Sequence, residues 1–328
     1  MLSYILWKSM SFFASLNLVQ VKTFYLKFLV LCDKTGLLKK IFGLPVSQPV
    51  KVMNMHFMNP LGLGAGFDVN GDFVNTLAKL GFGFLEFGTV TPHAQICNQS
   101  NTQIKLYPQE KSIISCDADQ NMGVDYLVNN LENCSYKGII GIQINKNNIT
   151  PDKNIVDDLQ YCMRRVIKVA NYVAIQVPES IVKDHSALDE FFGRLKATQA
   201  HLHGLYELYL SIVVKVPLSI EYHDLKNLVR CAIKYKIDAL NTCYPKHTLL
   251  PIEGRLFGYA IQKHATKIQN KMAELVANKL PIIASGGIIT KLDAVNRMRD
   301  GAKLVQIYSG FFFSGPKFIK ELVTDLKN

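Results

Sequence analysis

Short apolar runs alternate with amphipathic stretches along most of this 328-residue chain, and this alternation limits the folds open to it. From about residue 58 onward, runs of β-branched and aromatic residues end at glycine or polar clusters, and an amphipathic stretch follows each run. The runs expected to form strands are residues 61–64, 84–88, 139–144, 173–177, 208–216, 237–240, 281–284 and 303–307. Eight strand–helix units predict an α/β fold of the (β/α)8 TIM barrel class. An open, doubly wound sheet is the competing arrangement, because the number of strands does not prove closure.

Amphipathic stretches between these runs are expected to form the helices around the barrel. They are residues 72–80, 124–131, 155–169, 188–199, 225–236, 259–279, 291–300 and 316–326. Residues 51–57 alternate like one further strand ahead of the first unit, and we expect this strand to cover the barrel floor.

The first 45 residues differ from the rest of the chain in charge and hydropathy. Residues 1–50 contain six lysines and one acidic residue, Asp33, whereas the whole chain has 37 basic and 26 acidic residues. The longest uncharged run there, residues 9–21, is shorter than the ~20 residues that a membrane-spanning helix needs. We therefore expect a helical membrane-association segment, residues 1–45, ahead of a barrel, residues 46–328. A transit peptide, or a helix packed on the barrel, would explain the same composition.

Cysteine spacing and charge distribution argue against two common kinds of partner. The seven cysteines form no C-x-x-C pair, so neither a disulfide scaffold nor a metal site is expected. The net charge of +11 would suit nucleic acid, but the aromatic residues gather in the N-terminal segment instead of alternating with arginine. We therefore expect no nucleic-acid partner.

Two glycine-containing turns follow the last two predicted strands. The tripeptides are SGG at residues 285–287 and YSG at residues 308–310, and each is expected to lead straight into a helix. Loops after the seventh and eighth strands form the usual phosphate site of (β/α)8 barrels, where backbone N–H groups face the anion. The sequence therefore predicts a phosphate cradle at these two turns.

Three long strings of sequence resemble one known family. They are NPLGLGAGFD at residues 59–68, GFGFLEFGTVTP at 81–92 and LVQIYSGF at 304–311. These strings are similar to the first, second and eighth barrel strands of the class 2 dihydroorotate dehydrogenases, and the resemblance extends over essentially the whole chain. Members of that family are membrane-associated flavoenzymes that oxidise dihydroorotate to orotate and reduce quinone.

The resemblance implies an FMN cofactor, contact with membrane lipid, and quinone as a partner reached through the N-terminal helices. It implies a peripheral location, on the cytoplasmic face of a bacterial inner membrane or on the mitochondrial inner membrane. Lys215 matches the family lysine near the polar edge of the flavin ring, and an ordinary snorkelling lysine is the alternative. The positions that match cofactor-binding residues are Ala65, Gly66, Thr89, Gln143, Gln176, Lys215, Gly254, Gly286, Gly287, Tyr308 and Ser309.

Residues that act on the substrate in the family often differ here. Val69 stands where the family has a lysine, and the loop after the fourth strand lacks the family's serine base in its usual setting. Glu179 falls at the position of that serine, and Ser180 takes it if the alignment moves by one residue, so these two are the catalytic candidates. We therefore expect weak or absent dihydroorotate oxidation. A working family enzyme and a non-catalytic, membrane-associated or complex-subunit barrel are the alternatives.

Overall fold

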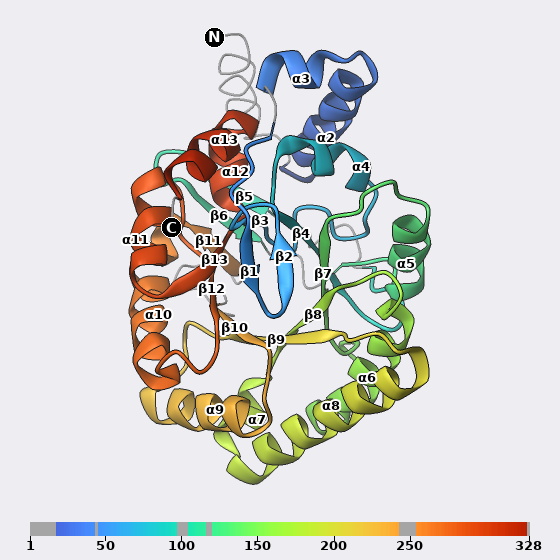
Figure 1. Ribbon diagram of the computed structural model, residues 1–328, viewed down its shortest axis with the longest axis vertical. Helices are drawn as coiled ribbons and strands as arrows, with labels where there is room; N and C mark the ends of the chain where they lie inside the picture. The colour runs from blue at the N-terminus through green and yellow to red at the C-terminus, as the bar shows by residue number, and fades with distance from the viewer. Residues whose placement is uncertain (1–17, 43–44, 97–103, 116–119, 243–253, 327–328) are drawn as a thin grey trace.

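Eight parallel strands pair side by side until the last meets the first, so the sheet closes on itself. The computed structural model describes residues 18–42, 45–96, 104–115, 120–242 and 254–326 (Figure 1). The barrel strands are β3 (Leu61–Leu63), β4 (Phe84–Val90), β7 (Ile139–Ile144), β8 (Tyr172–Gln176), β9 (Ser211–Val216), β10 (Ala239–Thr242), β12 (Ile282–Ala284) and β13 (Ala302–Ile307). Pairing of β13 with β3 closes the barrel. The predicted (β/α)8 fold is therefore confirmed, and the open sheet is excluded.

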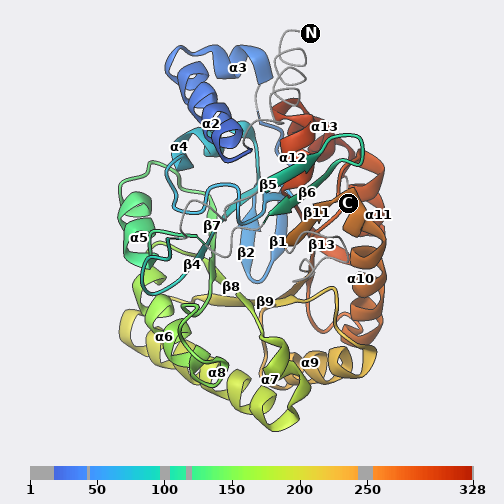
Figure 2. The same ribbon diagram turned by 180° about the vertical axis from the view of Figure 1, so that it is seen from behind.

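Helices follow the strands and surround the barrel (Figures 1 and 2). They are α4 (Val74–Leu77), α5 (Val124–Glu132), α6 (Ile155–Val166), α8 (His185–Tyr206), α9 (Tyr222–Lys234), α10 (Gln262–Val276), α11 (Lys291–Arg299) and α13 (Pro316–Asp325). In α6, Ile155, Leu159 and Cys162 recur at helical spacing and are buried. Acidic residues in its first turn and arginines in its last turn complement the helix dipole.

A β-hairpin of β1 (Val50–Val52) and β2 (Met55–Phe57) covers the floor of the barrel. The expectation of one continuous strand over residues 51–57 is wrong. The two residues between the strands have φ angles of 51° and 57° and reverse the chain. Phe57 packs edge-on against Phe84, at 5.3 Å between ring centroids, inside the barrel. The expected cover of the barrel floor is therefore confirmed, but a hairpin provides it.

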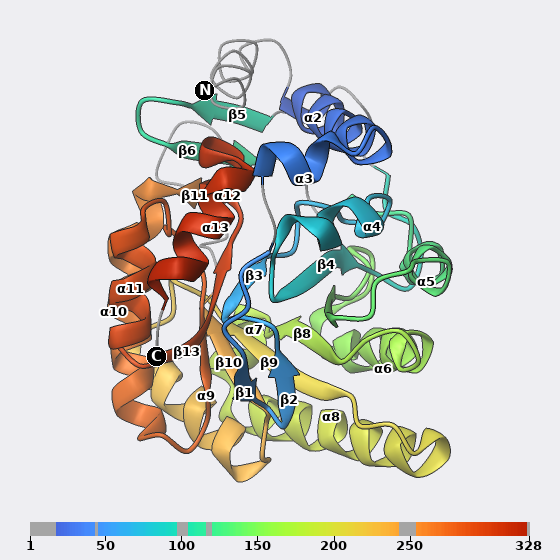
Figure 3. The same ribbon diagram turned by 45° about the horizontal axis from the view of Figure 1, so that its top comes forward.

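A three-stranded antiparallel sheet lies at the other end of the barrel (Figure 3). We call β5 (Ile104–Tyr107), β6 (Ser112–Ser115) and β11 (Arg255–Gly258) the accessory sheet. The sequence patterns did not predict it. β11 belongs to the loop after β10, so its pairing with β6 joins two separate loops of the barrel. The backbones of these two loops lie so close together that a Cβ on Gly258 would be 2.1 Å from the carbonyl oxygen of Lys111.

The described part of the N-terminal segment forms α2 (Leu18–Lys34) and α3 (Leu37–Phe42), near the accessory sheet (Figure 3). One face of α2 packs on the barrel, where the ring centroid of Tyr25 lies 6.1 Å from that of Phe311. Of the helices that the structure describes, none is both long and apolar enough to cross a membrane. Residues 1–17 of the expected membrane-association segment lie outside the described residues.

Candidate functional site

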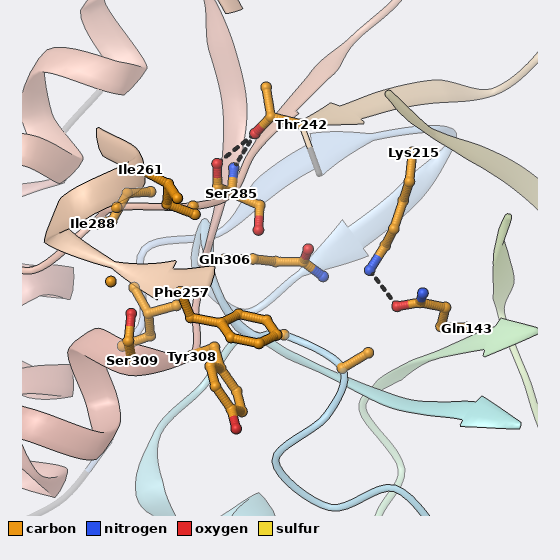
Figure 4. Close-up of a pocket in the computed structure, with 16 residues that line it drawn as sticks. Gln143, Lys215, Thr242, Phe257, Ile261, Ser285, Ile288, Gln306, Tyr308 and Ser309 are labelled. Carbon is orange, nitrogen blue, oxygen red and sulfur yellow. Dashed lines mark hydrogen bonds between the residues drawn. The ribbon is translucent and has the colours of Figure 1, made fainter. Parts of the chain in front are cut away.

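A pocket opens at the carboxyl ends of the barrel strands (Figure 4). Its empty space is about 550 Å³, including solvent at its mouth. It is lined by Gly64, Ala65, Gln143, Lys215, Thr242, Phe257, Gly258, Ile261, Ser285, Gly286, Gly287, Ile288, Gln306, Ile307, Tyr308 and Ser309. We call the part made by the turn at residues 285–287 the turn side. The part made by Gln143, Lys215 and Gln306 is the polar side.

Gly286 and Gly287 shape the turn side through their backbone conformation. Their φ angles of 85° and 72° are strained for any residue with a side chain. A Cβ on Gly287 would also lie 2.3 Å from the Cα of Gln262. Within the described residues, the amides of Gly286 and Gly287 donate to no acceptor, so both can donate to an anion. This geometry is what a phosphate cradle requires.

The helix after this turn begins later than the sequence suggests. α11 starts at Lys291, and Thr290 and Asp293 cap it with a reciprocal pair of hydrogen bonds. The expectation that residues 285–287 lead straight into a helix is therefore wrong, since three residues separate the turn from the helix. The second turn does run directly into a helix, the six-residue α12 (Ser309–Ser314).

Arg297 of α11 lies behind the glycine turn and is only 2% exposed. Its Nη1 donates to the carbonyl oxygen of Gly286 at 3.0 Å, and its Nη2 donates to that of Ser285 at 3.0 Å. Nη2 also donates to Thr242 Oγ1 at 3.1 Å, and Nε donates to Gln269 Oε1. Burial lowers the pKa of Arg297 to about 10, so the side chain remains charged at neutral pH.

Lys215 and Glu86 form a buried ion pair on the polar side, with 2.6 Å between Nζ and Oε1. Lys215 also donates to Gln143 Oε1 at 2.7 Å (Figure 4). Glu86 accepts further hydrogen bonds from Tyr172 Oη at 2.9 Å and from Gln306 Nε2 at 2.8 Å. Burial, and then the Glu86 carboxylate, raise the pKa of Tyr172, so its hydroxyl stays protonated. Lys215 is 6% exposed, and its charge is compensated inside the barrel instead of reaching solvent.

Phe257, from the accessory sheet, also enters the pocket. Figure 4 shows its ring beside that of Tyr308, and the two ring centroids are 5.0 Å apart. Phe257, Glu86 and Arg297 are not among the site residues predicted from the sequence. A single acidic residue in an otherwise apolar strand was an available signal for Glu86, whereas the other two carry no local signal.

Seven of the eleven predicted cofactor-binding residues line the pocket. They are Ala65, Gln143, Lys215, Gly286, Gly287, Tyr308 and Ser309. The remaining four, Gly66, Thr89, Gln176 and Gly254, are not among the lining residues. The Gly66 amide donates to the Gly88 carbonyl oxygen at 2.8 Å, and Thr89 is buried in β4. Gln176 ends β8 opposite Lys215, and Gly254 directly precedes β11.

The two candidate bases lie away from the pocket. The loop after β8 forms a short helix, α7 (Glu179–Lys183), and the Glu179 carboxylate lies 2.9 Å from Lys183 Nζ. These two side chains are 63% and 62% exposed. Ser180 Oγ donates to Asp152 Oδ2 at 2.6 Å, also at the surface. In the described structure, neither candidate lines the pocket.

Together, the closed barrel and the glycine turn after its seventh strand have the architecture of the phosphate-binding (β/α)8 barrels. A family model described as dihydroorotate dehydrogenase matches residues 47–328. The chain belongs to the dihydroorotate dehydrogenase family.

Individual relatives support the same assignment. A protein of Haemophilus influenzae (strain PittGG) named dihydroorotate dehydrogenase (quinone) is 35% identical over 305 residues, which cover 89% of this chain and 90% of the relative. A protein of the same name from Aliivibrio salmonicida (strain LFI1238) is 36% identical over 295 residues, covering 86% and 88%. The resemblance to the class 2 family is therefore confirmed. A ligand-free DHODH structure from Eimeria tenella shares the fold, with a TM-score of 0.80 and 24% identity over 92% of each chain.

Proposed function

We propose that this chain is an FMN-binding protein of the dihydroorotate dehydrogenase family in which dihydroorotate oxidation is weak or absent. The observation that supports this most directly is a contrast within the site. The turn side and polar side of the pocket are well ordered by buried contacts, whereas both candidate bases lie outside it. FMN, when bound, would supply the redox chemistry, and the residues of the chain would bind and orient it.

The residues of the pocket fit the two ends of FMN. The amides of Gly286 and Gly287 suit the phosphate, and their placement depends on the backbone more than on neighbouring side chains. An ammonium has three donors, and two of those on Lys215 are engaged by Glu86 and Gln143. The third can serve the electron-rich edge of the flavin ring. These contacts support FMN as the ligand of the pocket.

The positions of the two candidate bases support slow turnover of dihydroorotate. In the family, a serine removes a proton from dihydroorotate, and a positioned base contributes ~10²–10⁴-fold to such a step. A base must lie within hydrogen-bonding reach of the proton that it removes. Glu179 is instead paired with Lys183 at the surface, and Ser180 is bound to Asp152. We therefore expect turnover of dihydroorotate to be reduced by this factor or more.

A working dihydroorotate dehydrogenase (quinone) is the second candidate. The identity of 35% over 89% of the chain to a relative of that name favours it. In that case, α7 would have to change conformation so that Glu179 or Ser180 faces the pocket. A barrel that keeps neither flavin nor activity, and serves as a membrane-associated or complex subunit, is the remaining alternative.

One experiment separates these candidates. FMN is titrated into the full-length apo chain, binding is followed by quenching of flavin fluorescence, and reduction of a soluble quinone is then measured with dihydroorotate. FMN binding with turnover ~10²–10⁴-fold below that of the H. influenzae relative supports the proposal. Turnover comparable to that of the relative supports the working enzyme. No quenching at millimolar FMN rejects the flavoprotein.

We further propose that the N-terminal segment holds the protein at a membrane surface and gives quinone access to the barrel. The outward face of α2 carries Phe24 and Leu31, which are 65% and 58% exposed, together with the exposed Lys27 and Lys34. Apolar and basic side chains on one face suit peripheral binding to an anionic membrane. Quinone appears in the names of the relatives, and we propose it as the acceptor for electrons that leave the flavin.

Vesicle sedimentation tests this surface. The full chain should pellet with phosphatidylglycerol vesicles, and the double variant Phe24→Ser, Leu31→Ser should bind about tenfold more weakly, because two apolar side chains are lost. Leu205→Ser is the matched control, since Leu205 is 61% exposed on α8. A wild-type chain that stays in the supernatant would contradict this part of the proposal.

A further inference from the structure

Arg297 is a buried charge without a carboxylate within hydrogen-bonding reach among the described residues. Its contacts are two carbonyl oxygens, one hydroxyl and one side-chain amide oxygen, all of which are neutral. Asp293 and Asp300 act on it only through space. Since a buried charge is costly unless it is paired, we propose that Arg297 is a positioning residue that makes the pocket selective for a phosphate monoester, whose negative charge complements the guanidinium.

The hydrogen bonds of Arg297 also orient the cradle. The peptide groups that follow Ser285 and Gly286 are trans, and in a trans peptide the C=O and N–H bonds point in opposite directions. The guanidinium holds both carbonyl oxygens on its own side. The amides of Gly286 and Gly287 therefore point away from Arg297, toward the pocket that both glycines line.

Two other positive groups beside the pocket are already engaged. At the start of α11, the carboxylate of Asp293 accepts hydrogen bonds from two amides at 3.0 and 2.7 Å, which satisfies the helix terminus. Lys215 lies on the polar side and is neutralised by Glu86. The positive potential behind the glycine turn therefore comes from Arg297, and it reaches a bound phosphate through the aligned peptide dipoles.

The test compares two ligands that differ only in the phosphate. Dissociation constants of FMN and riboflavin are measured by fluorescence quenching for the full-length wild-type chain and for Arg297→Gln and Arg297→Lys. Arg299→Gln is the matched control, because Arg299 lies on the same helix, is exposed, and changes the net charge equally. This arm of the test rests on the proposed flavin binding.

The ratio of the two dissociation constants is the decisive readout. The wild-type chain should prefer FMN by roughly 10²-fold, and Arg297→Gln should reduce this preference by about tenfold while leaving riboflavin affinity within about twofold. Arg297→Lys keeps the charge but cannot hold both carbonyl oxygens, so its preference should be intermediate. Arg299→Gln should keep the wild-type ratio. Equal weakening of both flavins by Arg297→Gln, as a purely structural role requires, would overturn the proposal.

A second arm is independent of flavin. Inorganic phosphate should raise the melting temperature of the wild-type chain more than chloride does at equal ionic strength, and Arg297→Gln should lose this difference. If neither flavin binds but the phosphate effect is present and depends on Arg297, the flavoprotein proposal fails and this one stands. A phosphate effect that is the same in both proteins would overturn it. If Arg297→Gln does not fold, Arg297→Lys decides, and an unchanged wild-type response would refute the role of the guanidinium.

Discussion

The glycine turn and α7 lie at the same end of the barrel, but they are held in different ways. The turn at residues 285–287 is fixed by its backbone conformation and by the buried Arg297. Glu179 and Ser180 on α7 are held by contacts at the surface, where an ion pair is worth only ~0–1 kcal/mol. Backbone conformation and buried partners therefore fix the glycine turn, whereas α7 is held by exposed contacts that solvent weakens.

Of the substitutions considered, removal of the Glu86 carboxylate should destabilise the protein most. Glu86→Gln leaves the Lys215 ammonium inside the barrel without its counter-charge, so the free energy of unfolding should fall by ~3–5 kcal/mol. Urea denaturation measures this loss. Lys79→Met is the control, because it removes an exposed pair with Asp33 and should cost ~0–1 kcal/mol. Similar small losses in both variants would show that burial does not distinguish the two regions.

A side chain at Gly287 should disrupt the turn without touching the polar side. Gly287→Ala places a Cβ 2.3 Å from the Cα of Gln262 at a positive φ angle. Its FMN dissociation constant should rise by about 100-fold, because the strained turn no longer presents its amides. Flavin titration measures the effect. Gly204→Ala on α8 is the control, since its Cβ would meet nothing within 4 Å, and it should bind FMN like the wild type.

Substitutions on α7 should have the smallest effect, because Glu179 and Ser180 make only exposed contacts. Glu179→Ala and Ser180→Ala should each change the free energy of unfolding by no more than ~0.5 kcal/mol and the FMN dissociation constant by less than about twofold. Denaturation and flavin titration check this. If Glu179→Ala abolished a measurable turnover of dihydroorotate, α7 would reach the pocket during the reaction, and its surface position would not describe the working state.

The barrel is predictable from sequence because each of its elements carries a local pattern, such as the buried spacing of α6. The accessory sheet is not predictable in this way. β5 and β6 are four residues each, and their partner β11 comes from a distant loop, so no local periodicity links them. The floor hairpin is missed for a different reason, since Met53 adopts a positive φ angle that its residue type does not signal.

The glycine turn is predictable because paired glycines after an apolar strand mark a tight turn in a known place. Arg297 is not, because on a helix of polar residues it reads as a surface side chain until the turn packs over it. The family resemblance predicts where Glu179 lies along the chain, but it does not predict which way the Glu179 side chain points. The short helix that starts after Pro178 directs this carboxylate to solvent, and direction decides whether it can act as a base.

β6 and β11 belong to loops that follow β4 and β10, so their pairing joins segments that are far apart in the sequence. Contacts between segments far apart in sequence form slowly, because a large loop must close first. The accessory sheet, and Phe257 with it, is therefore expected to order last and to open first. Its amide hydrogens should exchange faster than those of the barrel strands, and a ligand packed on Phe257 should slow that exchange. Ligand binding is then linked to a local folding step at the mouth of the pocket, while the barrel beneath stays closed.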